Sequence, residues 1–215
     1  MLINSEILQT ASLSLTVSVA STLLATLFGL PLGIFLGLSS QKGIRIGRSI
    51  VSTFTGLPPV VVGLFVYILL SASGPLGNMR LLFTPAAMIL AQIIIVLPII
   101  AAVVFPAVNT VAEEISETCR GLNLPKGRIF KLLMAECRFV MLAAILQGFG
   151  RAISEVGAVM LVGGNIRFST RVLTTAIVLE TSKGEYTNSL TLAAILIGIS
   201  LTINLFAGKY REVDR

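Results

Sequence analysis

Five long apolar stretches constrain what this chain of 215 residues can fold into. Each has at least 20 residues, enough to cross the hydrocarbon core of a bilayer as a tilted helix. Only 12% of the residues are charged, whereas a soluble domain has about a quarter. The sequence therefore predicts an all-α integral membrane protein, a single transmembrane domain over residues 1–215 with no second folded domain. The predicted spans are residues 10–38, 49–71, 82–108, 139–163 and 189–208.

The distribution of basic residues predicts the orientation of these spans. With the N-terminus outside, eleven of the sixteen Lys and Arg residues fall in the inner segments. Basic residues favour the cytoplasmic side, so the pattern predicts an N-out, C-in topology. The same bias explains the net charge of +6 without a nucleic-acid partner. The inner basic residues are Lys42, Arg45, Arg48, Arg120, Lys126, Arg128, Lys131, Arg138, Lys209, Arg211 and Arg215.

Small residues and prolines recur within the spans. Three glycines of the first span, spaced by four, form one helix face on which a second backbone can approach closely. We interpret that face, which consists of Gly29, Gly33 and Gly37, as a packing surface. A hinge at Pro31 is the alternative. Pro58-Pro59, Pro98 and Pro106 predict kinks, with gating as the alternative.

The segment from 163 to 189 is too polar to span the membrane. Its central part, TRVLTTAIVLE, has the apolar spacing of an amphipathic helix with a Ser/Thr-capped start. We expect it to lie against the outer face of the bundle or to dip partway into it.

The polar segment from 110 to 138 predicts a rigid elbow of two helices. Glu113, Glu114 and Glu117 suit the start of a short helix, where the dipole favours acidic side chains. Asn123 suits a left-handed helix stop, and Pro125 suits the first position of the next helix. A loop of this kind can transmit a push into the membrane. The alternative is a merely solvated, charged loop.

The fourth predicted span carries Arg151 and Glu155, although each charge costs about 2.5–3.5 kcal/mol near the bilayer centre. Residues four apart share a face of a helix, so the two can pair. The pair is either a structural pin or an element of a pathway or gate. Gly157, Gly163 and Gly164 would give this helix its close-packing face and its outer end.

Several other classes of function lack their signature in the sequence. There is no His, so haem, iron–sulfur or zinc sites are not expected. Cys119 and Cys137 share the predicted cytoplasmic segment, where we expect reduced thiols. A membrane-embedded enzyme would gather several Asp, Glu or His residues in its spans. An ATP-independent channel or carrier would act without an ATPase subunit.

Two segments resemble the permeases of ABC importers. Glu117-Thr118-Cys119 and Asn123 are similar in spacing to the Glu-Ala-Ala and Gly positions of the EAA loop. Ala135-Glu136 replaces the family's Leu-Pro, which predicts an unkinked helix from about Lys126 into the fourth span. The stretch GFGRAISEVGAVMLVGGNI, followed by TRVLTTAI, resembles the corresponding segment of molybdate and tungstate permeases. It is most similar to the tungstate type, with Val156 in place of a Phe of the molybdate type.

This resemblance implies the core of a type I ABC importer permease with five transmembrane helices. It implies a homodimer in the plasma (inner) membrane of a prokaryote, two ABC ATPase subunits and an extracytoplasmic oxyanion-binding protein. No GxxxxGK[ST] motif occurs, so ATP and Mg are expected on the partner ATPase and no cofactor or metal on this chain. The expected substrate is tungstate, then molybdate, then sulfate.

Three groups of site residues are expected, the first from the resemblance and the other two from the charges in and just after the fourth predicted span. The ATPase-coupling group is Glu113, Glu117, Thr118, Cys119, Gly121, Asn123, Leu124 and Pro125. The pathway or gate group is Arg151, Glu155, Gly157, Gly163, Gly164 and Asn165. Arg167 and Arg171 either contact the anion or its binding protein at the outer face, or act as ordinary interfacial anchors.

Overall fold

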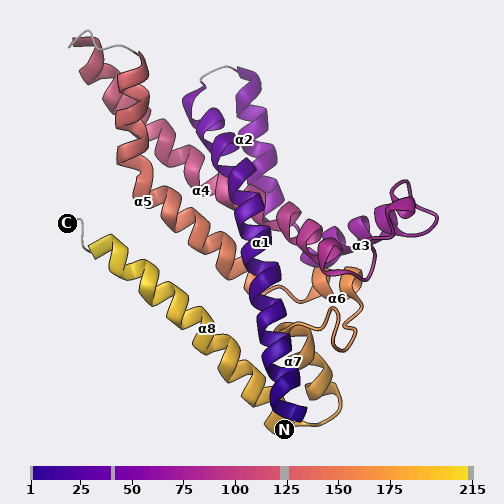
Figure 1. Ribbon diagram of the computed structural model, residues 1–215. Coiled ribbons are helices and arrows are strands. Elements are labelled where there is room, and N and C mark those ends of the chain that lie inside the picture. Colours follow the sequence, from indigo (N-terminus) through magenta and orange to yellow (C-terminus); the bar gives the residue numbers. More distant parts are fainter. Residues whose placement is uncertain (1, 40–41, 122–125, 213–215) are drawn as a thin grey trace.

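The computed structural model describes residues 2–39, 42–121 and 126–212, and its side chains are described for residues 5–39, 43–115 and 127–205. Every regular element in these ranges is helical, as the sequence predicts (Figure 1). In chain order the elements are α1 (Leu2–Leu38), α2 (Lys42–Thr55), α3 (Pro59–Leu70), the 3-10 helix η1 (Gly77–Met79), α4 (Pro85–Gly121), α5 (Lys126–Ile153), α6 (Gly157–Gly163), α7 (Leu173–Ser182) and α8 (Tyr186–Glu212).

The long helices α1 and α4 form the central pair of the molecule (Figure 1). A Cβ atom at Gly33 would lie 2.9 Å from Val104 Cβ, and one at Gly37 would lie 2.7 Å from Val108 Cβ. Gly29 faces Ile100 in the same way, at 3.2 Å. The glycine face of α1 is therefore a packing surface against α4, as predicted. Pro31, Pro98 and Pro106 all lie inside continuous helices.

The number of spans agrees with the prediction only in part. Three of the described helices are long and apolar enough to cross a membrane, over Ser5–Leu38, Pro85–Ile115 and Tyr186–Leu205. The pair α2–α3 raises the number to four if it is counted as one broken span. Its two halves meet at 99°, because Gly56, Leu57 and Pro58 interrupt the helix where the prolines predict a kink.

The fourth predicted span is not one helix. α5 is continuous from Lys126, as predicted, but it ends at Ile153, and the chain resumes as the short α6 at Gly157. The interruption falls on Ser154, Glu155 and Val156, and no proline causes it. The packing described below accounts for it.

The prediction of a new helix around Glu113 is also wrong. α4 runs without a break from Pro85 to Gly121, so Glu113 and Glu114 lie near its C-terminal end. No Gly or Pro occurs between Pro106 and Gly121, and the Ala and Glu residues of this segment are good helix formers. The helix therefore continues beyond the apolar stretch, and the favourable dipole contact expected at a helix start is absent.

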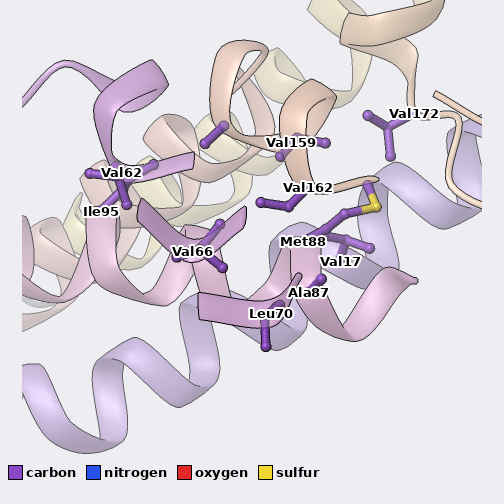
Figure 2. Packing of buried hydrophobic residues seen from close by; sticks show 12 residues of the cluster. Val17, Val62, Val66, Leu70, Ala87, Met88, Ile95, Val159, Val162 and Val172 are labelled. Atoms are coloured by element: carbon purple, nitrogen blue, oxygen red, sulfur yellow. The ribbon is translucent and has the colours of Figure 1, made fainter. Parts of the chain in front are cut away.

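Buried apolar residues form two large clusters along α4. One fills the space where α3 and α6 meet the first half of α4, and it contains Val66, Met88 and Val162 (Figure 2). The other joins α1, α4 and α5 through Val104, Leu133 and other residues. The C-terminal ends of α1 and α4 and the N-terminal ends of α2 and α5 lie at one end of the molecule, and the N-terminal end of α1 lies with α7 at the other (Figure 1).

Candidate functional site: the interrupted helix between α5 and α6

A helix that stops inside a bilayer must find other partners for its terminal backbone groups. Here the amide of Ser154 still donates to the carbonyl of Gly150 at 3.3 Å, and the Ser154 hydroxyl donates to the carbonyl of Arg151 at 3.2 Å. The amide of Glu155 donates to the carbonyl of Ala152 at 3.2 Å. These contacts close the last turn of α5 locally.

Glu155 connects the end of α5 to the start of α6. Its Oε2 lies 2.8 Å from Nη1 of Arg151, which confirms the predicted pairing. Its Oε1 accepts a hydrogen bond of 3.0 Å from the amide of Ala158, one of the unpaired donors of α6. The carboxylate is thus both half of an ion pair and a helix cap, and only 2% of the Glu155 side chain is exposed, against 32% for Arg151.

Side chains from α1, α4 and α7 satisfy the rest of the interruption. Gln92 donates from Nε2 to the carbonyl of Ala152 at 2.9 Å and accepts at Oε1 from the hydroxyl of Ser21 at 2.6 Å. The hydroxyl of Thr174 donates to the carbonyl of Glu155 at 2.8 Å. The irregular backbone is therefore buried in protein, the condition under which a membrane tolerates it.

Glycines let neighbouring elements approach the interruption. A Cβ atom at Gly63 of α3 would lie 2.6 Å from the Cα atom of Ala158, and one at Gly157 would lie 2.6 Å from Val60 Cγ2. Helix α3 therefore packs directly on the backbone of α6. This contact and the hydrogen bonds of Gln92 and Thr174 hold the chain in its interrupted form.

The C-terminal end of α6 is a left-handed turn. Gly164 has a φ of +70° and caps α6, and Asn165 follows with a φ of +51°. Gly163 packs against Met88, whose Sδ would lie 2.9 Å from a Cβ atom there. Gly163 and Gly164 thus mark the end of this helix, as the sequence predicts. The predicted pathway group is contiguous, but the structure surrounds it with protein on the α1, α3 and α4 sides.

Arg167 and Arg171 share one acidic partner. Glu6 of α1 accepts two hydrogen bonds from Arg167, at 3.0 and 2.5 Å, and one from Nη1 of Arg171, at 2.9 Å. The hydrogen bond and charge of Glu6 raise the pKa of Arg167 above its ordinary value. Through these hydrogen bonds, the two arginines hold the N-terminal end of α1 to the segment before α7. Glu6 also offsets part of their charge.

Only part of the predicted coupling group can be placed. Glu113 is exposed on α4 and accepts a hydrogen bond of 2.9 Å from Nδ2 of Asn109. The backbone of Glu117, Thr118, Cys119 and Gly121 belongs to the last turns of α4. Asn123, Leu124 and Pro125 lie outside the described residues.

Cys137 is a free, buried thiol on α5. Burial, and secondarily the charge of Glu136, raises the pKa of this thiol above its ordinary value. No cluster of three or more His, Cys, Asp or Glu residues with metal-binding geometry occurs among residues 5–39, 43–115 and 127–205.

Sequence reasoning missed four partners of the site: Ser14, Ser21, Gln92 and Thr174. The signal was present in α1, where buried hydroxyl residues recur at helical spacing. These residues are Thr10, Ser14, Ser18, Ser21 and Thr22. They lie on the face of α1 that meets α4 and α7; the hydroxyl of Ser14, for example, accepts from the amide of Leu173 at 2.7 Å.

The fold of this chain is similar to that of a known transporter structure. A structure of the MetNI methionine ABC transporter in inward-facing conformations matches with a TM-score of 0.76. The match covers 97% of this chain and 95% of that one, at 17% identity, so it shows the fold alone. No family model matches the chain.

Curated relatives match along nearly the whole sequence. A probable anion ABC transporter permease protein of Haloferax volcanii is 41% identical, over 94% of this chain and 89% of the relative. The tungstate uptake system permease protein TupB of Peptoclostridium acidaminophilum is 40% identical, over 93% and 88%. With this identity and coverage, and with the fold of an ABC transporter permease, the chain belongs to the family of anion ABC transporter permeases that includes TupB.

Proposed function

We propose that the chain is the membrane permease subunit of an ATP-driven importer for an oxyanion, and that the oxyanion is tungstate. The observation that carries this proposal is the 40% identity to a tungstate uptake permease, which extends over 93% of the chain. The segment around the interrupted helix resembles the tungstate type independently, through Glu155-Val156-Gly157 and Gly164-Asn165.

The proposed assembly has two copies of this chain, two ABC ATPase subunits that bind ATP and Mg, and an extracytoplasmic binding protein. It lies in the inner membrane of a prokaryote with the N-terminus outside. Five crossings result if α2–α3 and α5–α6 each count as one interrupted crossing. The basic ends of α2 and α5 support this orientation, because they lie together at the end opposite the N-terminus (Figure 1).

In this assembly the turn between α4 and α5 receives the movement of the ATPase. α4 and α5 are continuous helices of 37 and 28 residues, so a displacement of their turn moves both as rigid levers. Packed helices switch between discrete arrangements, and a small push can change the accessible side. Glu117 and Pro125 remain the proposed contacts with the ATPase.

The contacts of Arg151 and Glu155 support a structural pin more than a moving gate. Glu155 caps α6 as well as pairing with Arg151, so separating the pair would also free the amide of Ala158. An Arg at position 155 could not accept that hydrogen bond. A charge-swapped double variant would therefore fail for structural reasons, and neutral substitutions give the sharper test.

The proposal is tested by uptake of radiolabelled tungstate into proteoliposomes that hold the assembled complex, with molybdate and sulfate as competitors. We expect ATP-dependent uptake of the labelled tungstate, which unlabelled tungstate inhibits more strongly than molybdate or sulfate does. The control is the same complex without ATP. Uptake without ATP would indicate a channel or carrier instead, and stronger competition by molybdate would reassign the substrate.

The coupling turn has its own test. We expect Glu117→Arg or Asn123→Pro to abolish transport and association with the ATPase while the protein still inserts into the membrane. Arg128→Ala on the exposed start of α5 is the control for changed charge. Normal transport by the two elbow variants would refute the coupling role.

A further inference from the structure

The guanidinium of Arg48 joins three helices at the end of the molecule where α4 ends and α5 begins. Its Nε donates to the carbonyl of Leu36 at 2.8 Å, and its Nη2 donates to the carbonyls of Gly37 and Ser39 at 3.3 and 3.1 Å. The same Nη2 donates to Oδ1 of Asn109 on α4 at 2.8 Å. Arg48 itself belongs to α2, so one side chain binds α1, α2 and α4.

The contacts with α1 follow from the chemistry of a helix end. The last carbonyls of α1 have no amide partner in the helix, and the helix dipole favours a cation there. An arginine can serve several such carbonyls because its donors form a rigid planar fork. Arg48 also lies 5.8 Å from the ring centroid of Phe105 on α4, within the range of a cation–π contact.

The network continues toward the proposed coupling residues. Asn109 accepts from Arg48 at Oδ1 and donates from Nδ2 to Oε1 of Glu113, one helical turn further along α4. Glu113 lies one further turn before Glu117. A hydrogen-bonded chain therefore leads from the end of α1, through Arg48 and Asn109, to the segment of α4 that approaches the turn.

Further along α2, α2 and α4 line an open groove of about 310 Å³. Its lining residues are Ile50, Val51 and Phe54 of α2 and Ile93, Ile94, Leu97 and Pro98 of α4. The α1–α4 pair is closely packed along its glycine face. Arg48 provides the hydrogen-bonded attachment of α2 to this pair.

We infer that Arg48 is a positioning residue that makes α2, and through it α3, follow α4 when the α4–α5 turn moves. Because α3 packs on α6 through Gly63, this attachment relays the movement to the interrupted helix. The inference rests on the proposed transport function. It assigns a role in coupling to Arg48 and Asn109, which both lie outside the predicted elbow of residues 110–138.

The test compares variants in the assembled complex in proteoliposomes. Arg48→Ala removes the whole network, Arg48→Lys keeps the charge without the fork, and Asn109→Ala cuts the link to Glu113 but leaves the cap on α1. Arg45→Ala removes an exposed charge one turn away and serves as the matched control. Uptake and ATP hydrolysis are measured together, with the melting temperature of each complex.

We expect the oxyanion taken up per ATP hydrolysed to fall about tenfold in Arg48→Ala, since charge-assisted hydrogen bonds are lost. Arg48→Lys and Asn109→Ala should show smaller falls in the same ratio, and Arg45→Ala none. If uptake, ATP hydrolysis and the melting temperature of Arg48→Ala all fall together, the inference is wrong and Arg48 is only a structural cap on α1. An unchanged ratio would overturn it as well. If Arg48→Ala does not assemble, the ratio in Asn109→Ala decides.

A second readout does not depend on transport. Spin labels at Ser52 of α2 and Lys131 of α5, both exposed, report the distance between these helices in a cysteine-free background. We expect this distance to stay the same when nucleotide binds to the unsubstituted complex, because α2 follows α4 and α5, and to change in Asn109→Ala, where α2 no longer follows. If the distance stays the same in that variant as well, the inference is wrong. If the unsubstituted complex takes up no oxyanion, the proposed function fails, and this distance still decides the role of Arg48.

Discussion

In two clusters of the described residues, around Glu155 and around Glu6, a glutamate pairs with arginine, and the surroundings of these clusters differ. At the interruption between α5 and α6, Glu155 is 2% exposed and pairs with one arginine while capping a helix. Near the N-terminal end of α1, Glu6 is 23% exposed and pairs with two arginines. Breaking a buried pair leaves an uncompensated charge and costs several kcal/mol, whereas an exposed pair contributes about 1 kcal/mol or less.

The difference separates two roles for the same chemistry. Glu155 holds an irregular segment of backbone inside the protein, where it is 2% exposed, so its loss removes partners that water cannot replace. Glu6 fastens two surface segments whose polar groups can turn to water instead. Substitutions in the two clusters should therefore differ in magnitude although each removes one carboxylate.

The largest effect is expected at Glu155. Glu155→Leu removes the partner of Arg151 and the acceptor for the amide of Ala158, and should destabilise the permease by about 3–5 kcal/mol. Glu155→Gln keeps an acceptor for that amide and should lose less. The measurement is the thermal unfolding of the purified permease in detergent, with the exposed Glu185→Gln as control. If Glu155→Leu unfolds at the same temperature as the unsubstituted protein, the interruption does not depend on this carboxylate.

The second effect concerns the packing that keeps the helix interrupted. A methyl group at Gly63 would meet the backbone of Ala158 at 2.6 Å, so Gly63→Ala should cost about 1–3 kcal/mol and lower tungstate uptake. Gly150→Ala is the matched control, because no atom lies within 4 Å of its added methyl group. That variant should be neutral or stabilised, as expected for Gly to Ala within a helix. Equal unfolding temperatures of the two variants would contradict the close approach of α3 to α6.

The sequence was sufficient where a feature depends on neighbours along one helix. The glycines at 29, 33 and 37 share a face by their spacing alone, and Arg151 reaches Glu155 because four residues make about one turn. The kink at Pro58 follows from the chemistry of proline. Each of these needs no knowledge of what packs against it.

The sequence was insufficient where the partners come from other helices. Nothing local ends α5 at Ile153, since the interruption depends on Gln92 of α4, on Thr174 of α7 and on the approach of α3. Near Glu113 the acidic residues fit either the start of a helix or the continuation of one. The helix α4 continues through this segment because no residue breaks it there. The contacts of Glu6 and Arg48 were not predicted, because their partners lie more than 150 residues away from Glu6 and up to 61 residues away from Arg48.

The smallest effect is expected at Glu6, where Glu6→Gln removes the carboxylate that serves Arg167 and Arg171. Since Glu6 is partly exposed and water can replace part of its contacts, uptake by the assembled complex should stay within about twofold of the unsubstituted value. Arg167→Gln is the matched variant on the other side of the pair and should behave alike if the two residues act only as a fastening. A contact of Arg167 with the anion or its binding protein predicts a different result: Arg167→Gln would raise the half-saturating tungstate concentration, whereas Glu6→Gln, which frees the guanidinium, would lower it. Opposite shifts of this concentration in the two variants would thus assign the Glu6 cluster to recognition of the anion or its binding protein. Equal small shifts would mean that the fold depends on the Arg151–Glu155 pair and not on the Glu6 cluster.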